Sequence, residues 1–319
     1  MIERLLGLEA LPVPPHIFAV DAAGLRYGRF ARANGSYELE EYHAVDSPPD
    51  LFGSGPLGGA MREPALFAAP LTALIERISE PVEEASLVVP DPWLRLTFTE
   101  ASDLPRSAGE REEVLRWKLR RLVPFKVEEL RIGGTELSPL PNRAGEKRVL
   151  LGFGLDHMLE QIEDAFGAQG IRLGQISNES LSLLPAVRDP LRDVELGLVV
   201  LAAGTGYSMV FVWRGEPALH RFKSLDKLGD RDSSERLVAR DLRMTRAFLK
   251  EELSSARLGR VLLVAPEEET AAWCEKLESA FEIPAHVLES QHLALSGRVP
   301  EVSVREISPL LGAARQEIP

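Results

Sequence analysis

Hydrophobic positions along the chain switch repeatedly between the alternation typical of strands and the three-to-four-residue spacing typical of helices, which predicts a mixed α/β protein. The chain opens with apolar runs at residues 17–20, 25–30 and 37–43, and turn-forming residues separate each run from the next. We expect these runs to form a meander of strands. Apolar positions over residues 65–79 then recur at helical spacing and predict a helix.

Residues 86–176 follow the order strand, strand, helix, strand, strand, helix and strand, which predicts a compact α+β module. The first helix of this module, over residues 110–123, is amphipathic. It is expected to stop at Pro124, because proline lacks the N–H that a helix interior needs. Its apolar face is expected to hold Val114, Trp117 or Leu115, Leu119 and Leu122.

The second half of the chain starts with a stretch that has no charged side chain, from Leu196 to Trp213. Its length approaches that of a membrane-spanning helix. Two glycines interrupt its centre and its flanks are rich in valine and aromatic residues, so two strands joined by a turn are the better interpretation. Strand and helix patterns alternate after it, and we expect a soluble protein without a signal peptide.

Composition and charge narrow the classes of function. A length of 319 residues exceeds one typical domain and favours two lobes. Acidic residues outnumber basic ones by 49 to 37, and the resulting net charge of -12 disfavours non-specific binding to nucleic acid or anionic lipid. Cys274 is the only cysteine, so the chain can form no internal disulfide, and we interpret this residue as a structural thiol in a reducing compartment.

Motifs for metal binding and covalent catalysis are absent from the sequence. The six histidines lack the spacing of metal ligands, and no serine stands in a G-x-S-x-G turn. We therefore expect no metal site and no catalytic residue. One basic cluster allows two interpretations, a solvated helix face or a patch that faces a membrane or an acidic partner. This cluster consists of Arg116, Lys118, Arg120, Arg121 and Lys126.

Four stretches carry a family resemblance. They are Phe-Ala-Val-Asp-Ala-Ala-Gly at residues 18–24, the helix with its Val-Pro-Phe end at 110–130, the strand, helix and Asn-Glu-Ser-Leu-Ser-Leu-Leu segment at 148–184, and the closing helix at 307–315. In order and spacing they are similar to PilM, the actin-like cytoplasmic protein of type IV pilus assembly, which is related to FtsA and to the cytoplasmic part of GspL. The resemblance implies an actin-like (ribonuclease H-like) α/β fold of two lobes, with an α+β subdomain inserted in the first lobe.

The resemblance also implies where the lobes begin and end. The first lobe would take residues 1–185 and contain the inserted subdomain at about 86–176. The second lobe would take residues 186–319 and looks trimmed, and its C-terminal helix at about 305–315 would return to the first lobe.

Two turns correspond to the phosphate loops of actin-like ATPases. In such enzymes small residues bring backbone N–H groups to the phosphates, and acidic side chains organise Mg²⁺ and the attacking water. Here the first turn keeps Asp21 and Gly24 but lacks the family's polar residues. The second turn contains Gly204, Thr205 and Gly206, and these glycines are also explained as plain turn residues.

Two further departures from the family pattern concern the second lobe. Ala202 stands where the family usually has an acidic residue, and residues 262–269 carry three glutamates in place of the glycine pair that packs on adenosine. We therefore expect a pseudo-ATPase with no bound ATP or Mg²⁺ cofactor. An active actin-like ATP-binding protein is the alternative.

The family's partners follow from the same resemblance. In PilM, an N-terminal cytoplasmic peptide of the membrane protein PilN docks between the first lobe and the inserted subdomain. The resemblance therefore implies a scaffold that binds a PilN-like peptide and other pilus assembly proteins at the inner face of the inner membrane, associates with the membrane through partners, and binds no nucleic acid. The analogous type II secretion component is the alternative, and the residues leave open whether copies of the chain associate. Candidate partner contacts are Arg116, Arg120, Arg121, Pro124 and Phe125.

Overall fold

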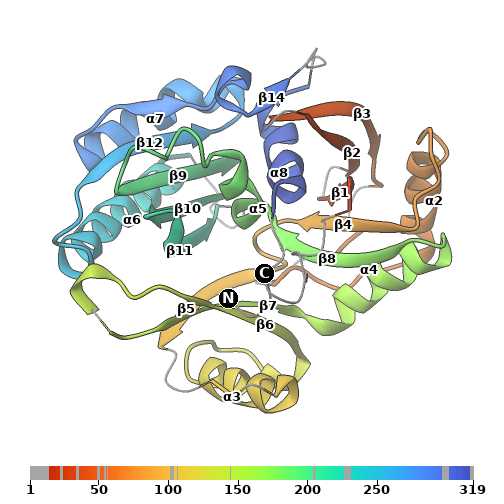
Figure 1. Cartoon of the computed structure of the whole chain (residues 1–319), viewed down its shortest axis with the longest axis horizontal. Helices are drawn as coiled ribbons and strands as arrows, with labels where there is room; N and C mark the ends of the chain where they lie inside the picture. Colours follow the sequence, from red (N-terminus) through yellow and green to blue (C-terminus); the bar gives the residue numbers. More distant parts are fainter. Residues whose placement is uncertain are drawn as a thin grey trace. The chain divides into compact units, whose positions relative to one another are not determined.

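The computed structural model divides into two compact units, each with its own hydrophobic core. Unit 1 comprises residues 1–94, 155–189 and 290–319, and unit 2 comprises residues 95–154 and 190–289. Figure 1 labels most of the helices and strands of both units. The structure describes residues 14–21, 24–33, 36–48, 51–53, 55, 57–100, 104–105, 107–143, 145–203, 206–225, 231–296 and 302–316.

A sheet with the strand order β14-β3-β2-β1-β4-β8 forms the centre of unit 1 (Figure 1). The first three strands pair antiparallel as the predicted meander, and β4 and β8 continue the sheet in parallel. Parallel neighbours need long crossover connections, and the one between β4 and β8 contains residues 95–154 and helix α4. The strands are β1 (His16–Val20), β2 (Gly24–Ala33), β3 (Ser36–Asp46), β4 (Glu84–Val89), β8 (Arg172–Asn178) and β14 (Leu295–Ser296).

Helices cover both faces of this sheet. On one face, Tyr27 of β2 joins a buried cluster with Phe67 and Phe166 of the helices α2 and α4. The next residue of β2, Gly28, lies beside Leu310 of α8. Because adjacent residues of a strand point to opposite sides, α8 and the neighbouring α5 lie on the other face. The bounds are α2 (Pro64–Ile75), α4 (Asp156–Ala168), α5 (Glu179–Ala186) and α8 (Val304–Ala314).

Unit 2 contains a sheet of the order β11-β10-β9-β12-β13 and a smaller sheet of the order β5-β7-β6. The larger sheet consists of β9 (Leu196–Ala203), β10 (Gly206–Trp213), β11 (Glu216–Ser224), β12 (Leu258–Val264) and β13 (Ala285–Val287). The smaller sheet consists of β5 (Arg95–Glu100), β6 (Leu130–Leu137) and β7 (Arg148–Leu155). The helices of this unit are α3 (Ala108–Arg120), α6 (Arg231–Glu252) and α7 (Glu267–Phe281), with short 3-10 turns η1 (Val127–Glu129) and η2 (Pro141–Arg143), while η3 (Ser290–His292) belongs to unit 1.

The long charge-free stretch forms the hairpin of β9 and β10, as its central glycines predict. Every residue of β10 is buried, and the hairpin packs with Leu242 of α6 and Trp273 of α7 in the core of unit 2. A strand that is buried on both faces cannot accommodate a charged side chain, which explains why this stretch contains none. In the part of the chain that the structure describes, no helix has the length and apolar character needed to cross a membrane.

Two strands that the sequence analysis placed in the α+β module belong to the six-stranded sheet instead. Residues 86–89 lie in β4 and residues 171–176 lie in or just before β8, whereas the separate small sheet begins only at Arg95. All residues from Ala85 to Val89 are buried, as expected for a strand covered on both faces. The local pattern of strands and helices cannot show which sheet a strand joins.

The small sheet is attached to the large sheet of the same unit by polar contacts. Arg148 of β7 is almost fully buried, and its Nη1 atom donates to the carbonyl oxygens of Pro217 and Ala218 on β11 at 3.3 and 3.4 Å. The backbone N of Ser138 donates to a carboxylate oxygen of Glu216 at 2.7 Å. Residues 95–154 are therefore inserted in the chain between two strands of unit 1 but pack with unit 2.

Candidate functional site

The turn between β1 and β2 holds the first predicted nucleotide-site residue, Asp21. Both of its carboxylate oxygens have partners within unit 1. Oδ1 accepts a hydrogen bond from the backbone N of Gly24 at 2.9 Å, and Oδ2 lies 2.5 Å from Nη1 of Arg26. Nε of Arg26 also contacts Oε1 of Glu306 at 3.1 Å, so one arginine bridges two carboxylates.

The charge on Arg26 is well stabilised. Its partial burial opposes the positive charge, but the Asp21 and Glu306 carboxylates outweigh that effect and raise the pKa of Arg26 above its usual value. A metal ion that used Asp21 as a ligand would have to displace this guanidinium. The geometry therefore gives Asp21 a structural role in the β1–β2 turn.

Two of the predicted glycine positions have a steric explanation. A Cβ atom on Gly24 would lie 2.3 Å from the carbonyl oxygen of Val45 on β3, and a Cβ atom on Gly206 would lie 2.6 Å from that of Lys223 on β11. A side chain cannot approach a backbone so closely, so the pairing of the strands alone requires glycine at both positions. Gly204 and Thr205 lie outside the described residues.

Carboxylates that the sequence analysis did not single out lie at the start of α5. Asn178 caps this helix by accepting a hydrogen bond from the backbone N of Leu181 at 3.0 Å. The buried Asp91 accepts from the backbone N and the Oγ of Ser180, at 3.2 and 2.6 Å. Loss of hydration, followed by the negative charge of Asp91, raises the pKa of the half-buried Glu179 to about 7.

The same carboxylates interact with the β1–β2 turn. Asp21 adds to the rise in the pKa of Glu179, whereas the positive charges of Arg305 and Arg26 oppose it. The charges of Asp21 and Asp91 thus both act on Glu179, although the three residues are far apart in the sequence. Among the described residues, no group of three His, Cys, Asp or Glu side chains is arranged as metal ligands would be.

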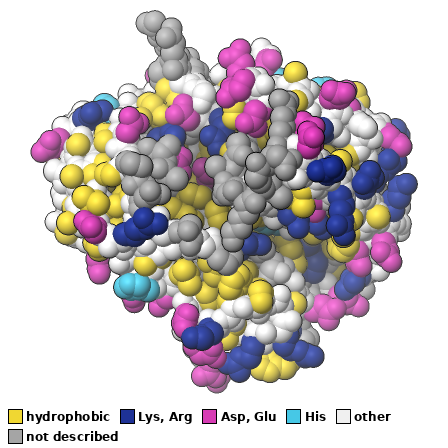
Figure 2. Space-filling model, turned by 180° about the vertical axis from the view of Figure 1, so that it is seen from behind, with side chains coloured by type: hydrophobic (Ala, Val, Ile, Leu, Met, Phe, Trp, Pro, Cys, Tyr) yellow, Lys and Arg dark blue, Asp and Glu magenta, His cyan; other side chains and the backbone are white. Residues whose placement is uncertain are grey.

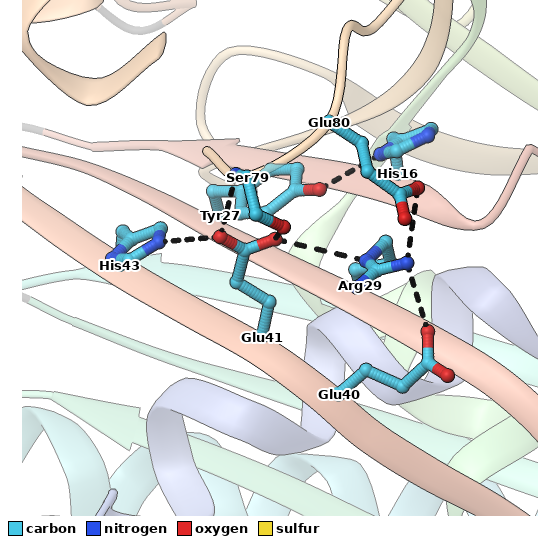
Figure 3. A network of polar contacts seen from close by, with 8 residues as sticks. All are labelled: His16, Tyr27, Arg29, Glu40, Glu41, His43, Ser79 and Glu80. Carbon is cyan, nitrogen blue, oxygen red and sulfur yellow. Dashed lines mark hydrogen bonds and ion pairs between the residues drawn. The ribbon is translucent and has the colours of Figure 1, made fainter. Parts of the chain in front are cut away.

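A second polar network crosses strands β1 to β3 on the same sheet (Figure 3). The hydroxyl of the buried Tyr27 lies 2.7 Å from Nδ1 of His16. Nη1 of Arg29 lies 3.1 Å from Oε2 of Glu40 and 3.1 Å from Oε2 of Glu80. Loss of hydration, followed by the nearby Arg29 charge, lowers the pKa of His16.

Glu41 is the centre of this network. Its Oε1 atom accepts from Nε2 of His43 and from the backbone N of Ser79, both at 2.9 Å, and its Oε2 atom accepts from the Ser79 hydroxyl at 2.9 Å (Figure 3). Burial opposes the negative charge, but these hydrogen bonds outweigh it and lower the pKa of Glu41. These hydrogen bonds hold the segment that follows α2 against β3, so the network has a structural role.

The predicted partner-binding residues divide into two groups. Arg116 stabilises the fold, because its guanidinium pairs with Glu112 at 2.7 Å and donates to the carbonyl oxygens of Val127 and Leu130. Phe125 is half-buried, with its ring centre 6.3 Å from that of Phe153 on β7. Both side chains therefore have contacts within unit 2.

The remaining predicted contacts are exposed at the end of α3. Arg120 forms an ion pair with Glu128, and Pro124 is exposed. The guanidinium of Arg121 lies 5.5 Å from the ring centre of Trp117, over its face. We call these residues, together with the exposed Leu122, the α3 surface, which consists of Trp117, Arg120, Arg121, Leu122 and Pro124.

The buried face of α3 differs in part from the predicted apolar face. Leu115 and Leu119 are buried, whereas 56% of Trp117 and 48% of Leu122 remain exposed. Trp117 is two residues from each buried leucine, which places it on the opposite side of a helix with a turn of 3.6 residues. The pair Leu115 and Leu119, four residues apart, was the signal that could have identified the buried side.

The basic cluster is less positive than its sequence suggests. Three of its members have acidic partners, since Arg116 pairs with Glu112, Arg120 with Glu128, and Lys126 with Glu129 at 3.0 Å. The α3 surface shares only Arg120 and Arg121 with this cluster, and Arg120 is one of the paired residues. The α3 surface is therefore a mixed aromatic and cationic surface and not a strongly basic one.

Comparison with known proteins gives the fold. No family model matches the chain, and no curated protein matches it either. Among solved structures, the chain is similar to a PilM-PilN type IV pilus biogenesis complex, with a TM-score of 0.73, 16% identity, and coverage of 95% of this chain and 96% of the other.

Two further structures agree with this result. One is a protein with an actin-like ATPase fold from Bacteroides thetaiotaomicron, with a TM-score of 0.50, 9% identity and coverage of 86% and 90% of the two chains. The other is the cytoplasmic domain of EpsL, an inner membrane component of the type II secretion system of Vibrio cholerae, with a TM-score of 0.50, 12% identity and coverage of 94% and 93%. The resemblance to PilM is confirmed at the level of the fold, and this chain has the actin-like α/β fold.

Proposed function

We propose that this protein is a cytoplasmic scaffold of type IV pilus assembly, bound to the inner membrane through a PilN-like partner. The observation that carries the proposal is the similarity to a PilM-PilN complex, which covers 95% of this chain. The scaffold holds the N-terminal cytoplasmic peptide of the membrane protein and connects it to other assembly proteins. The similarity to the EpsL cytoplasmic domain supports the type II secretion component as the second candidate.

We also propose that the scaffold works without nucleotide chemistry. The ion pair of Asp21 with Arg26 supports this, because it occupies the carboxylate that would organise Mg²⁺. The steric need for glycine at positions 24 and 206 supports it as well, since these residues then have a role that does not involve phosphate.

Isothermal titration tests both parts of the proposal. We expect Mg-ATP to give no binding heat, which means a dissociation constant above about 1 mM. A PilN-type N-terminal peptide added to the same sample should bind in the micromolar range, and a scrambled peptide of equal composition should not. Micromolar binding of Mg-ATP, or a peptide affinity that depends on ATP, would instead favour an actin-like switch.

The α3 surface is the part of the proposal that mutation can test directly. Aromatic and arginine side chains are enriched among residues that dominate binding energy, and Trp117 with Arg121 is such a pair. The contact is proposed for unit 2 alone and rests on the exposure of these side chains.

Trp117→Ala is expected to weaken peptide binding by roughly tenfold or more, because truncating an aromatic anchor at an interface costs about 1–3 kcal/mol. The urea midpoint of unfolding should stay nearly constant, since the side chain is mostly exposed. The matched control is Leu66→Ala on α2, which removes another exposed large apolar side chain, 44% accessible, from unit 1. Equal peptide affinities for wild type and Trp117→Ala would exclude the α3 surface as the contact.

A further inference from the structure

Helix α6 presents an exposed face that the proposed scaffold function does not use. Its side chains include Met244, which is 52% exposed, and Phe248, which is 39% exposed, one helical turn apart. Basic residues surround this pair. We define the α6 face as Arg236, Arg240, Arg243, Met244, Phe248 and Lys250.

The charge of this face is opposite to that of the protein as a whole. From residue 236 to residue 250 the sequence contains one carboxylate, Asp241, and it is buried. Asp241 accepts a hydrogen bond from Tyr207 at 2.9 Å and pairs with Arg221 at 2.5 Å, so it points into the unit. The solvent-facing charges of this stretch are therefore all positive, on a chain of net charge -12.

The cations of this face are available to a partner. Within the described part of the chain, neither Arg240 nor Arg243 forms an ion pair. Figure 2, which views the molecule from behind, shows a cluster of basic side chains at the right, which corresponds to the left of Figure 1, where α6 is drawn. Unpaired arginines keep their full capacity for a carboxylate, which they bind with two parallel hydrogen bonds.

A groove between α6 and α7 runs beside these residues. It has a volume of about 930 Å³ and lies wholly within unit 2. Arg243, Arg246 and Lys250 line it from α6, and Lys276 lines it from α7. Ala247 and Ala272 are among its small lining residues, which allow another chain to approach closely. Glu235 of α6 and Glu275 and Glu282 on the α7 side also line the groove, so it is a concave surface of mixed charge whose cations adjoin the α6 face.

We propose that the α6 face and this groove bind an acidic amphipathic helix of a partner protein. The carboxylates of such a helix would pair with Arg240, Arg243 and Lys250, and its apolar stripe would cover Met244 and Phe248. Arg243 and Lys250 line the groove, whereas Met244 and Phe248 lie on the neighbouring side of α6, so the helix would lie along α6 with its acidic edge toward the groove. The site is distinct from the α3 surface and gives the protein a second docking position.

Charge complementarity favours a protein segment over a lipid surface. The α7 side of the groove carries Glu275 and Glu282, which would repel anionic headgroups, and Glu282 already pairs with Arg246. The net charge of -12 also opposes approach to an anionic membrane. A helix with both acidic and apolar positions can avoid these two glutamates, whereas a continuous lipid surface cannot.

The probe is a synthetic helical peptide of about 18 residues, five turns of helix, in which glutamates flank a stripe of leucine and phenylalanine. We expect it to bind the full-length protein, measured by fluorescence anisotropy, and to bind less tightly as salt is added. A matched peptide with glutamine in place of glutamate should bind at least tenfold more weakly. No peptide binding at millimolar concentration would overturn the proposal.

Variants locate the site. Arg240→Glu with Arg243→Glu should weaken binding of the acidic peptide at least tenfold, and Met244→Ala with Phe248→Ala should also weaken it. The control with the same change in net charge is Arg32→Glu with Arg62→Glu, two exposed residues of unit 1, which should bind like wild type. Equal binding by all variants overturns the proposal. A second outcome also overturns the proposal: the protein binds phosphatidylserine vesicles, the α6 variants lose this binding, and the peptide does not bind. The α6 face would then recognise lipid.

Discussion

Gly312→Ala is expected to lower the free energy of unfolding by about 2 kcal/mol, although it adds only one methyl group and replaces glycine by the best helix former. Gly312 lies in α8, where this helix crosses α5 on the sheet of unit 1. A Cβ atom at this position would lie 1.7 Å from the carbonyl oxygen of Ser182. Such an overlap cannot be relieved by turning a side chain, because the opposing atom belongs to the backbone.

Two opposing contributions decide the size of this effect. Alanine in a helix is favoured over glycine by about 1 kcal/mol. Overpacking of a well-packed interior costs typically about 1–3 kcal/mol and occasionally more, and here α8 would have to move away from α5. Ser308, one turn earlier on α8, is also fully buried, so the whole crossing depends on small residues. We expect the steric cost to exceed the gain in helix propensity.

Gly167→Ala on α4 is the matched control. This glycine is also helical, but it is exposed, and a Cβ atom added to it would meet no other described segment of the chain within 4 Å. The substitution should therefore stabilise the protein by up to about 1 kcal/mol. Urea unfolding followed by circular dichroism measures both variants. A Gly312→Ala variant as stable as wild type would mean that the α5–α8 crossing is looser than the structure shows.

Much of the fold could be predicted from the spacing of apolar residues. The meander of β1 to β3, the β9–β10 hairpin and the helical segments of both halves follow directly from local patterns. What local patterns could not predict is which sheet each strand joins. β4 and β8 pair with each other across more than 80 residues, as in the pairing of Val88 with Ser177, and only tertiary packing selects that partner.

The candidate site was predictable in part. The turn glycines and Asp21 could be located because turns favour these residue types, but the ion pair with Arg26 depends on where β2 places an arginine. Asp91 and Glu179 become neighbours only through the parallel pairing of β4 and β8. The sequence left open whether Trp117 or Leu115 faces the core, because an amphipathic pattern with several apolar residues does not show which of them is buried, and the structure buries Leu115.

Glu179→Gln is expected to stabilise the protein at pH 8 and to leave its stability at pH 4 nearly unchanged. The folded protein holds the proton of Glu179 up to a pKa of about 7, whereas the unfolded chain releases it near the ordinary value of 4.5. Below pH 4.5 both states are protonated, and burial of the neutral acid carries no charge penalty. As the pH rises from 4.5 to 7, the unfolded state ionises first, so the free energy of unfolding falls by about 2–3 kcal/mol.

The glutamine variant separates this contribution from all other titrations. Its amide does not ionise, so the stability difference between Glu179→Gln and wild type should grow from pH 4.5 to pH 7 and then remain constant. The desolvated carboxylate, repelled by Asp91 and Asp21 and only partly compensated by Arg305 and Arg26, is the physical source of that difference. Urea unfolding at several pH values measures it, and Glu160→Gln, an exposed position on α4, is the control. A difference that does not depend on pH would mean that water solvates the Glu179 carboxylate and that its repulsion by Asp91 and Asp21 is negligible.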